Sequence, residues 1–564
     1  MARCCIRKLK PGATPSPARF CNSSPQRTGK ASSRTAPRSN RFAVKSSCCY
    51  VRPERGKNVT FEAVSATTLL LGIRILDPGL EIDAIHDVLI SDGVVSKLDA
   101  PGTGATWAEH PDNGALGTLV ISQSDFAHEL ILTPGLIDIH THSFGSAGVN
   151  RPDAIGVESG VPIIADAGGA GPATIDDFIA LQTPSSKTRI KTFMSIESGG
   201  ITDSHRGHNT TRCATAMTTS SLDAFLGAIE RHQGTIVGLK VWAAAAAGIR
   251  WIDHATNLSE MIELPMLVHV GEFEDPNAES ITGDVIDRLQ GGDIVTHSFT
   301  GLPGALISQN GNILPEVMAA RGRGVLFDIA PGERNLSFDR AELAMEQGWL
   351  PDTISSDVHH WARAHNPFMS LPYVMSMFLA LGLSLRHTVK CATTNAADAI
   401  GINTGECCVG GNATLSLMAR QETPAIFSDG NRSIHGQESL IPVGSFLDGE
   451  WTEATASEIG HNTAIISSPE CEKFFAALGG ELAHLQRHDS RWRGEELHRL
   501  VHRARTDCGL DIAETLTALH DGMAPGAPTM PAGWLLEQLG PTETMARLDS
   551  LRAEGQQEAL STVS

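Results

Sequence analysis

Residues of the types that bind metals stand within or directly after several short apolar segments of this sequence. The segments are GLIDIHTH at 135–142, TIVGLK at 235–240, MLVHV at 266–270, DIVTH at 293–297 and DTISSD at 352–357. Together they supply six side chains suited to a metal site, namely His140, His142, Lys240, His269, His297 and Asp357. Because residues two apart on a strand point to the same face, the histidine pair at 140 and 142 can chelate one cation.

Each placement taken alone has an ordinary structural explanation. A single histidine on a strand is more often a hydrogen-bonded core residue than a ligand, and a buried aspartate can be satisfied by hydrogen-bond donors. Lysine, in contrast, is almost never fully buried without a partner, yet Lys240 stands in an apolar strand-like segment. Because several such placements occur in one chain, a shared metal site is a better explanation than separate structural roles.

The segments that carry these residues alternate with helix-like segments between Pro134 and about Ile400. Helical patterns are clearest in SLDAFLGAIERH at 221–232 and LPEVMAARG at 314–322. This alternation predicts an α/β fold, a (β/α)8 TIM-like barrel in which active-site groups gather at the carboxyl ends of the strands. A doubly wound open sheet is the second candidate, but no G-x-G-x-x-G motif follows a first strand.

Short strand-like segments flank this region on both sides. Those at 66–133 include a hairpin signal at Asp92-Gly93, and those at 401–455 resume the pattern after the barrel. We expect the two flanks to combine in a small β-sandwich around a barrel at 134–400. Residues 456–564 are predicted to form a helical extension, because Ser468-Pro469-Glu470 is a typical helix start.

The 564 residues carry a formal net charge of −20, which argues against a nucleic-acid partner. The head at 1–62 differs: its first sixty residues hold fourteen Lys and Arg and one acid, and we predict that it is disordered. Organelle targeting by residues 1–60 and a non-functional extension explain this composition equally well. Eleven cysteines without a C-x-x-C pair indicate a reducing compartment, with the cytoplasm as the default location.

One uncharged stretch, at 368–385, approaches the length of a membrane span. It contains Pro372 and Gly382, and the sequence has no second stretch of this kind. A buried helix packed on a sheet is therefore the better interpretation, and no membrane partner is expected.

Five motifs of the chain, in sequence order, resemble those of the amidohydrolase superfamily of metal-dependent hydrolases. They are PGLIDIHTH, VGLKVW, LVHVGE, DIVTHSFTG and TISSDVH. The likeness extends from about Leu69 to Leu447 and is greatest for the amidohydrolase/deacetylase branch, which is related to dihydroorotase. The resemblance implies a hydrolase that acts on carbon–nitrogen bonds other than peptide bonds.

The resemblance also implies two divalent metal ions, with zinc as the expected metal. The histidine pair at 140 and 142, together with Asp357, would hold the more buried ion. His269 and His297 would hold the other. Lys240 would bridge both as a carbamate formed with carbon dioxide, which requires a neutral lysine.

Hydrolysis of a linear amide by a metal-bridged hydroxide follows from this ligand set. Asp357 would be the catalytic general acid/base as well as a ligand, and the substrate would be a small N-acyl amino or hydroxy acid. A cyclic amidase resembling dihydroorotase or hydantoinase is the alternative function, and a non-catalytic, homo-oligomeric barrel scaffold is the second alternative. The enzyme, too, is a possible homo-oligomer.

Departures from the pattern of the family bear on the substrate. Trp242 stands where relatives often carry an arginine, which puts acidic N-acyl substrates in doubt. No arginine follows His142, where dihydroorotases have one for the substrate carboxylate. His359 and His360 either line the pocket or face solvent, and Glu272 either orients a ligand histidine or forms a salt bridge.

Overall fold

The computed structural model describes the backbone of residues 48–50 and 59–61, residues 67–104, 107, 119–144, 148–149, 151–182, 186–200, 220–243, 248–271, 280–366, 369–455 and 469–488, and single residues and short pieces between 492 and 548. The chain divides into two units, residues 1–62 and 63–564. In the first unit, the backbone forms an antiparallel pair of short strands, β1 (Cys48–Tyr50) and β2 (Val59–Phe61). The rest of the predicted disordered head lies outside the described residues.

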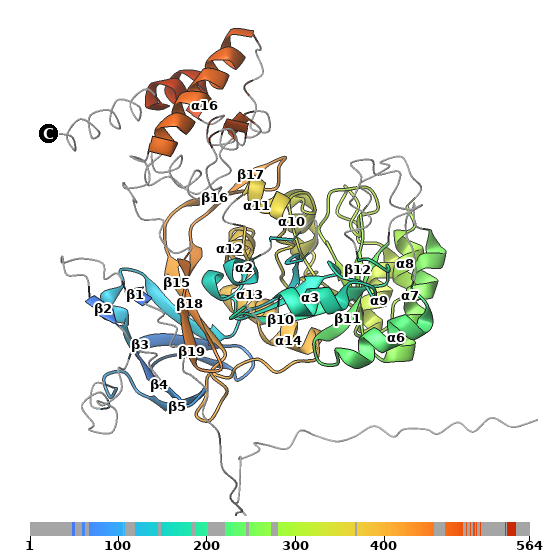
Figure 1. Ribbon diagram of the computed structural model, residues 1–564, viewed down its shortest axis with the longest axis horizontal. Helices are drawn as coiled ribbons and strands as arrows, with labels where there is room; N and C mark the ends of the chain where they lie inside the picture. Colours follow the sequence, from blue (N-terminus) through green and yellow to red (C-terminus); the bar gives the residue numbers. More distant parts are fainter. Residues whose placement is uncertain are drawn as a thin grey trace, which may run out of the picture. The chain divides into compact units, whose positions relative to one another are not determined.

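The second unit contains a seven-stranded parallel sheet whose strands lie in sequence order (Figure 1). Its strands are β8 (Ile137–Thr141), β9 (Ile163–Ala167), β10 (Arg189–Ser195), β11 (Ile236–Trp242), β12 (Met266–His269), β13 (Ile294–Thr296) and β14 (Leu326–Phe327). Thr353 forms a parallel bridge to Asp328, directly after β14, and Val358 forms one to Thr141 of β8. Segment 353–358 thus links the two outer strands, as the eighth strand of a TIM-like barrel does.

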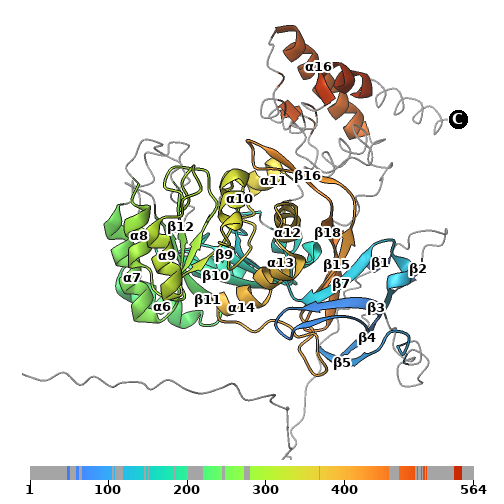
Figure 2. The ribbon, with the colours of Figure 1, turned by 180° about the vertical axis from the view of Figure 1, so that it is seen from behind.

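Helices follow most of these strands and cover the sheet. They are α2 (Pro152–Ile155), α3 (Ile175–Gln182), α6 (Leu222–Arg231), α7 (Ile249–Ile262), α8 (Thr282–Arg288), α9 (Pro315–Arg323), α10 (Phe338–Glu346), α11 (His360–His365), α12 (Leu371–Ala380), α13 (Leu385–Ala392) and α14 (Thr394–Ala399). Figure 2 shows α6 to α9 along the outer side of the sheet. The two helices predicted at 221–232 and 314–322 are confirmed as α6 and α9.

Local sequence explains where these two helices begin and end. The Ser221 hydroxyl accepts a hydrogen bond from the Ala224 amide at the start of α6, and Phe225 is buried one turn later. Helix α9 begins at Pro315, and its C-cap is Gly324, with φ of 93°. These residues therefore account for the start of α6 and for both ends of α9.

The apolar stretch at 368–385 contains α12, which is buried in the core, as predicted. Leu371, Val374, Met375 and Phe378 are shielded from solvent, and the Ser376 hydroxyl donates to the Pro372 carbonyl. Among the helices of the described part, none combines the length and apolar character of a membrane span.

Strands from both flanks of the barrel form one eight-stranded sheet. They are β3 (Thr67–Asp77), β4 (Ile82–Ser91), β5 (Val94–Asp99), β6 (Leu119–Ser122), β7 (Glu129–Pro134), β15 (Leu415–Gln421), β18 (Ser439–Leu447) and β19 (Glu450–Glu453). The flanks join where β7 pairs antiparallel with β15. The expected combination of the two flanks is thus present as one hydrogen-bonded sheet, and the hairpin at Asp92-Gly93 is confirmed by the antiparallel pairing of β4 with β5.

Two smaller pieces complete the described structure. Strands β16 (Ala425–Ser428) and β17 (Ser433–Gly436) form a hairpin, and α16 (Pro469–His488) begins at the predicted helix start. Phe474, Phe475 and Leu478 of α16 are buried in a cluster with Leu497 and Val501. The C-terminal extension thus has helical structure with a small core of its own, and much of the rest of 456–564 lies outside the described residues.

Candidate metal centre

All six predicted metal ligands lie at or just beyond the carboxyl ends of the parallel strands. His140 is the next-to-last residue of β8 and His142 follows that strand. Lys240 stands near the end of β11, His269 ends β12, His297 follows β13, and Asp357 lies in segment 353–358. Five of the six side chains are buried, and that of His269 is partly buried. Parallel strands direct their carboxyl ends to one side of a barrel, which explains why residues more than two hundred positions apart meet here.

Short distances connect these side chains around Asp357. Its Oδ1 lies 3.2 Å from His142 Nε2 and 3.4 Å from His140 Nε2. The Lys240 Nζ lies 3.0 Å from the same His140 nitrogen. One potential ligand atom each from His140, His297 and Asp357 lies within 4.8 Å of the others. This spacing fits oxygen and nitrogen donors converging on a cation.

His269 lies beside this group of side chains, in contact with His297. The ring centroids of these two histidines are 4.4 Å apart, and those of His297 and His140 are 5.1 Å apart. The structure therefore brings all six residues together.

Burial keeps the nitrogen ligands in the form that binds metals. It lowers the pKa of His140 well below the ordinary value, an effect to which the charge of Lys240 adds, and it lowers the pKa of His297 to about 4. Both imidazoles are consequently neutral at neutral pH, and neutral imidazole is the metal-binding form.

The environment of Lys240 also departs from that of an ordinary lysine. Burial lowers its pKa to about 8, although the charges of Asp357, Asp328 and Asp166 act in the opposite direction. A larger share of neutral amine is therefore present at neutral pH than on an exposed lysine, and neutral amine is the form that reacts with carbon dioxide. The residues present thus fit the two divalent ions and the carbamate that the sequence implies.

Three residues of the site have left-handed backbone conformations that are rare outside glycine. They are His297, Ala330 and Asp357, with φ of 65°, 45° and 52°. Two of them are connected, because His297 Nδ1 lies 2.7 Å from the Ala330 carbonyl oxygen. A carbonyl can only accept, so Nδ1 carries the proton and Nε2 keeps the lone pair that binds metal.

Two further buried aspartates accept hydrogen bonds from the segments that carry the predicted ligands. Neither was identified from the sequence. Asp138 accepts hydrogen bonds from the His140 amide and from the amide and hydroxyl of Ser356, at 2.5–3.3 Å. It thereby joins β8 to the segment that carries Asp357. Burial raises the pKa of Asp138 to about 7 against the effect of these hydrogen bonds. The signal available in the sequence was an acid within an apolar strand, the same signal that pointed to Asp357.

Asp166 performs a similar role after the histidine pair. It accepts hydrogen bonds from the amides of Ser143, Phe144 and Gly169, at 2.7–3.2 Å. These contacts hold the backbone of the turn that follows His142.

Aromatic and polar side chains surround the six residues. The Trp242 ring lies 6.3 Å from that of His269, and the His359 ring lies 6.0 Å from that of His142. His359 caps α11, since its Nδ1 accepts from the Ala362 amide, so it lies beside the site. Glu272 lies outside the described residues.

Gly332 marks a position where the site leaves no room for a side chain. Its φ is 51°, and a Cβ added there would lie 2.3 Å from Asp357 Oδ2.

We expect Gly332→Ala to displace this carboxylate and to lower kcat by about tenfold or more, as small displacements at catalytic groups do. The matched control is Gly348→Ala, since Gly348 has φ of 77° and nothing within 4 Å of its added Cβ. Both variants should lose about 1 kcal/mol of stability through backbone strain. Equal kcat in the two variants would contradict the expectation.

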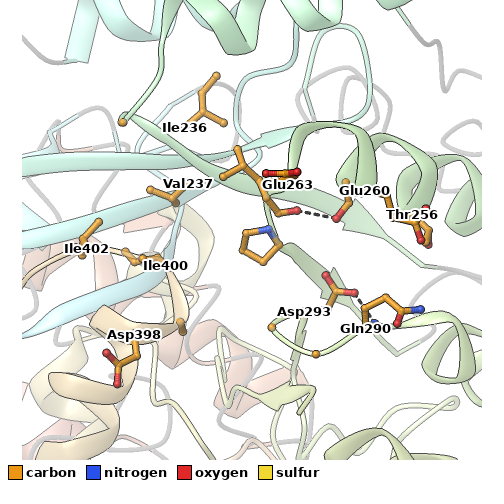
Figure 3. A pocket seen from close by; sticks show the side chains of 18 residues that line it. Ile236, Val237, Thr256, Glu260, Glu263, Gln290, Asp293, Asp398, Ile400 and Ile402 are labelled. Carbon is orange, nitrogen blue, oxygen red and sulfur yellow. Dashed lines mark hydrogen bonds between the residues drawn. The ribbon is translucent and has the colours of Figure 1, made fainter. Parts of the chain in front are cut away.

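A separate groove of about 720 Å³ lies near the amino-terminal ends of β11 and β12. Figure 3 shows its lining side chains, including Val237, Glu263 and Asp398. None of the six predicted ligands lines it, and its buried Asp293 accepts hydrogen bonds from the Met266 and Gln290 amides. The groove is thus distinct from the candidate metal centre.

Comparisons with known proteins agree on one family. The Amidohydrolase family matches residues 131–437, which is more than half of the chain and includes all six predicted ligands. A deacetylase of Brucella anthropi is 30% identical over 278 residues, covering 48% of this chain and 67% of that relative.

Solved structures extend the comparison to the fold. The crystal structure of a dihydroorotase is 25% identical, has a TM-score of 0.58, and aligns over 69% of this chain and 98% of its own. The crystal structure of an adenine deaminase has the same TM-score at 21% identity, aligns over 68% of this chain and 99% of its own, and supports the fold alone.

Proposed function

Because the chain belongs to the amidohydrolase family, we propose that it is a metal-dependent amidohydrolase that cleaves a linear amide of the N-acyl amino acid or N-acyl hydroxy acid type. Hydrolysis of a carbon–nitrogen bond is the activity that the family and its deacetylase and dihydroorotase relatives support. The convergence of six buried or partly buried donor side chains at one end of the barrel carries the proposal.

Two divalent ions are the proposed cofactors. His140, His142 and Asp357 would hold one ion, and His269 and His297 the other, with carboxylated Lys240 between them. When bound, such ions lower the pKa of a water molecule and polarise the carbonyl of the substrate. The neutral imidazoles described above support this assignment, as does the raised neutral fraction of Lys240.

Asp357 is the proposed general acid/base. Its Oδ1 faces the two histidines of β8, whereas its Oδ2 lies 3.4 Å from the Asn335 amide nitrogen. The carboxylate can therefore accept a proton from the attacking water and return it to the departing nitrogen without leaving its place. The left-handed backbone of Asp357 holds it between the ligand histidines.

The surroundings of the site favour an N-acyl compound whose side chain is neutral or apolar. Trp242 stands two residues beyond Lys240 on the same strand face and packs edge-on against His269. An indole offers apolar surface and one N–H donor, but no charge for a carboxylate. We therefore propose that N-acyl compounds with an apolar side chain are cleaved faster than those with an acidic side chain.

A cyclic amidase is the second candidate, favoured by the dihydroorotase structure among the neighbours. An assay panel of N-acetyl amino acids with apolar and acidic side chains, dihydroorotate and a hydantoin separates the two functions. We expect the apolar N-acetyl compounds to give kcat/KM at least about tenfold above both cyclic amides. Faster cleavage of a cyclic amide would replace the proposal with the second candidate. If the metal-loaded protein cleaved none of these compounds, the result would favour the non-catalytic barrel scaffold.

A further inference from the structure

A buried threonine stands between a predicted metal ligand and an aspartate. Thr296, the last residue of β13, has its Oγ1 2.9 Å from His140 Nδ1 and 2.9 Å from Asp328 Oδ2. All three side chains are 0–1% exposed. The arrangement therefore forms a buried chain of direct contacts that starts at the ring nitrogen of His140 on the side away from Asp357.

The protons in this chain have one consistent arrangement. Asp328 accepts from three hydroxyl groups, those of Thr296, Thr353 and Ser355, at 2.7–2.9 Å. A hydroxyl carries a single proton, and that of Thr296 is directed to Asp328. The Thr296 oxygen must then accept from His140, so Nδ1 of His140 carries the ring proton.

The opposite side of the His140 ring faces the candidate metal centre. Its Nε2 lies 3.0 Å from Lys240 Nζ and 3.4 Å from Asp357 Oδ1. Because a neutral imidazole carries one ring proton and Nδ1 holds it, Nε2 keeps the lone pair on the side of these two predicted ligands.

We propose that Thr296 and Asp328 are positioning residues that fix the tautomer and ring orientation of His140, so that its Nε2 is presented as a metal ligand. This inference rests on the part of the proposed function that places a metal ion at the site, and it does not depend on the identity of the substrate. A carboxylate behind a ligand histidine raises its basicity and holds its ring. Here the contact passes through a hydroxyl, because the Asp328 carboxylate oxygen lies 4.0 Å from His140 Nδ1.

The test compares three variants of the full-length protein. Thr296→Val removes the hydroxyl but keeps the branched shape, and Thr296→Ser keeps the hydroxyl. Thr353→Val is the matched control, because it removes a buried donor from the same Asp328 carboxylate, at Oδ1 rather than at the Oδ2 that accepts from Thr296. Zinc affinity is measured by competition with a chelator, beside thermal unfolding of the metal-free proteins.

We expect Thr296→Val to weaken zinc binding about 10–100-fold, whereas Thr296→Ser and Thr353→Val stay within about threefold of the unmodified chain. Both valine variants should lose similar amounts of stability in their metal-free forms. That result would show that the loss of a buried hydrogen bond does not by itself weaken zinc binding. Equal zinc affinity in the two valine variants, or no rescue by serine, would overturn the positioning role.

Failure of this inference is distinguishable from failure of the proposed function. If Thr296→Val keeps its zinc affinity while the unmodified chain cleaves N-acetyl amino acids, the positioning role fails and the amidase stands. If zinc affinity falls as expected but no amide of the panel is cleaved, the positioning role stands and the substrate proposal fails.

Discussion

The Asp357→Asn variant is expected to keep its fold and most of its metal but to lose about 10³-fold or more in kcat. An amide oxygen can still contact a cation, but an amide cannot accept a proton at neutral pH and return it. General acid/base groups contribute about 10²–10⁴-fold, and Asp357 would combine that role with ligation. Metal content by mass spectrometry and steady-state kinetics on the best N-acetyl substrate measure the two effects separately.

The control for this variant is Asp398→Asn. Asp398 is exposed and lines the groove near the amino-terminal ends of the strands, so the same chemical change there should leave kcat unchanged. An Asp357→Asn protein with kcat within tenfold of the unmodified enzyme would remove Asp357 from the acid/base role. Loss of all metal together with activity would reassign it to ligation alone.

The Lys240→Met variant is expected to lose activity by at least about a hundredfold, since the bridging oxygens of the carbamate would be missing. Its metal-free form should unfold at a temperature equal to or higher than that of the metal-free unmodified chain. Methionine fills a similar volume without the cost of burying an amine, and such replacements are often neutral or stabilising. Activity, bound metal and thermal unfolding are measured on the same preparations.

Lys191→Met is the matched control, because Lys191 lies on the neighbouring strand β10 but donates to the Gly234 carbonyl at the surface. It should retain both metal and activity. Native mass spectrometry adds a direct readout: the unmodified chain should carry the mass of one bound carbon dioxide, and Lys240→Met should lack it. A fully active Lys240→Met protein would contradict the bridging role.

The barrel and its six converging residues could be predicted because each leaves a local signal. An acid, a lysine or a histidine within an apolar run is costly unless something compensates for its burial, and parallel strands bring such residues to one end. Asp357 and Lys240 were identified in this way. Asp138, Asp166 and Asp328 give the same signal, but nothing in the sequence separates a residue that binds a metal from one that supports a ligand.

Long-range partners explain why the supporting contacts could not be predicted. Asp138 meets Ser356, which is 218 positions away, and Thr296 meets His140 across 156 positions. The left-handed backbone of Asp357 and the close approach of Gly332 depend on the assembled barrel in the same way. The continuous sheet from both flanks required the pairing of β7 with β15, and periodicity alone does not choose between that sheet and a sandwich.

A crystal structure with anomalous scattering recorded at the zinc edge would locate the proposed ions. Two peaks within coordination distance of the six predicted ligands, with density for a carboxyl group on Lys240, are the expected result. A single peak without Lys240 among its ligands, or no peak between His140 and Asp357 in protein purified with zinc, would contradict the two-metal site from which the proposed hydrolysis follows.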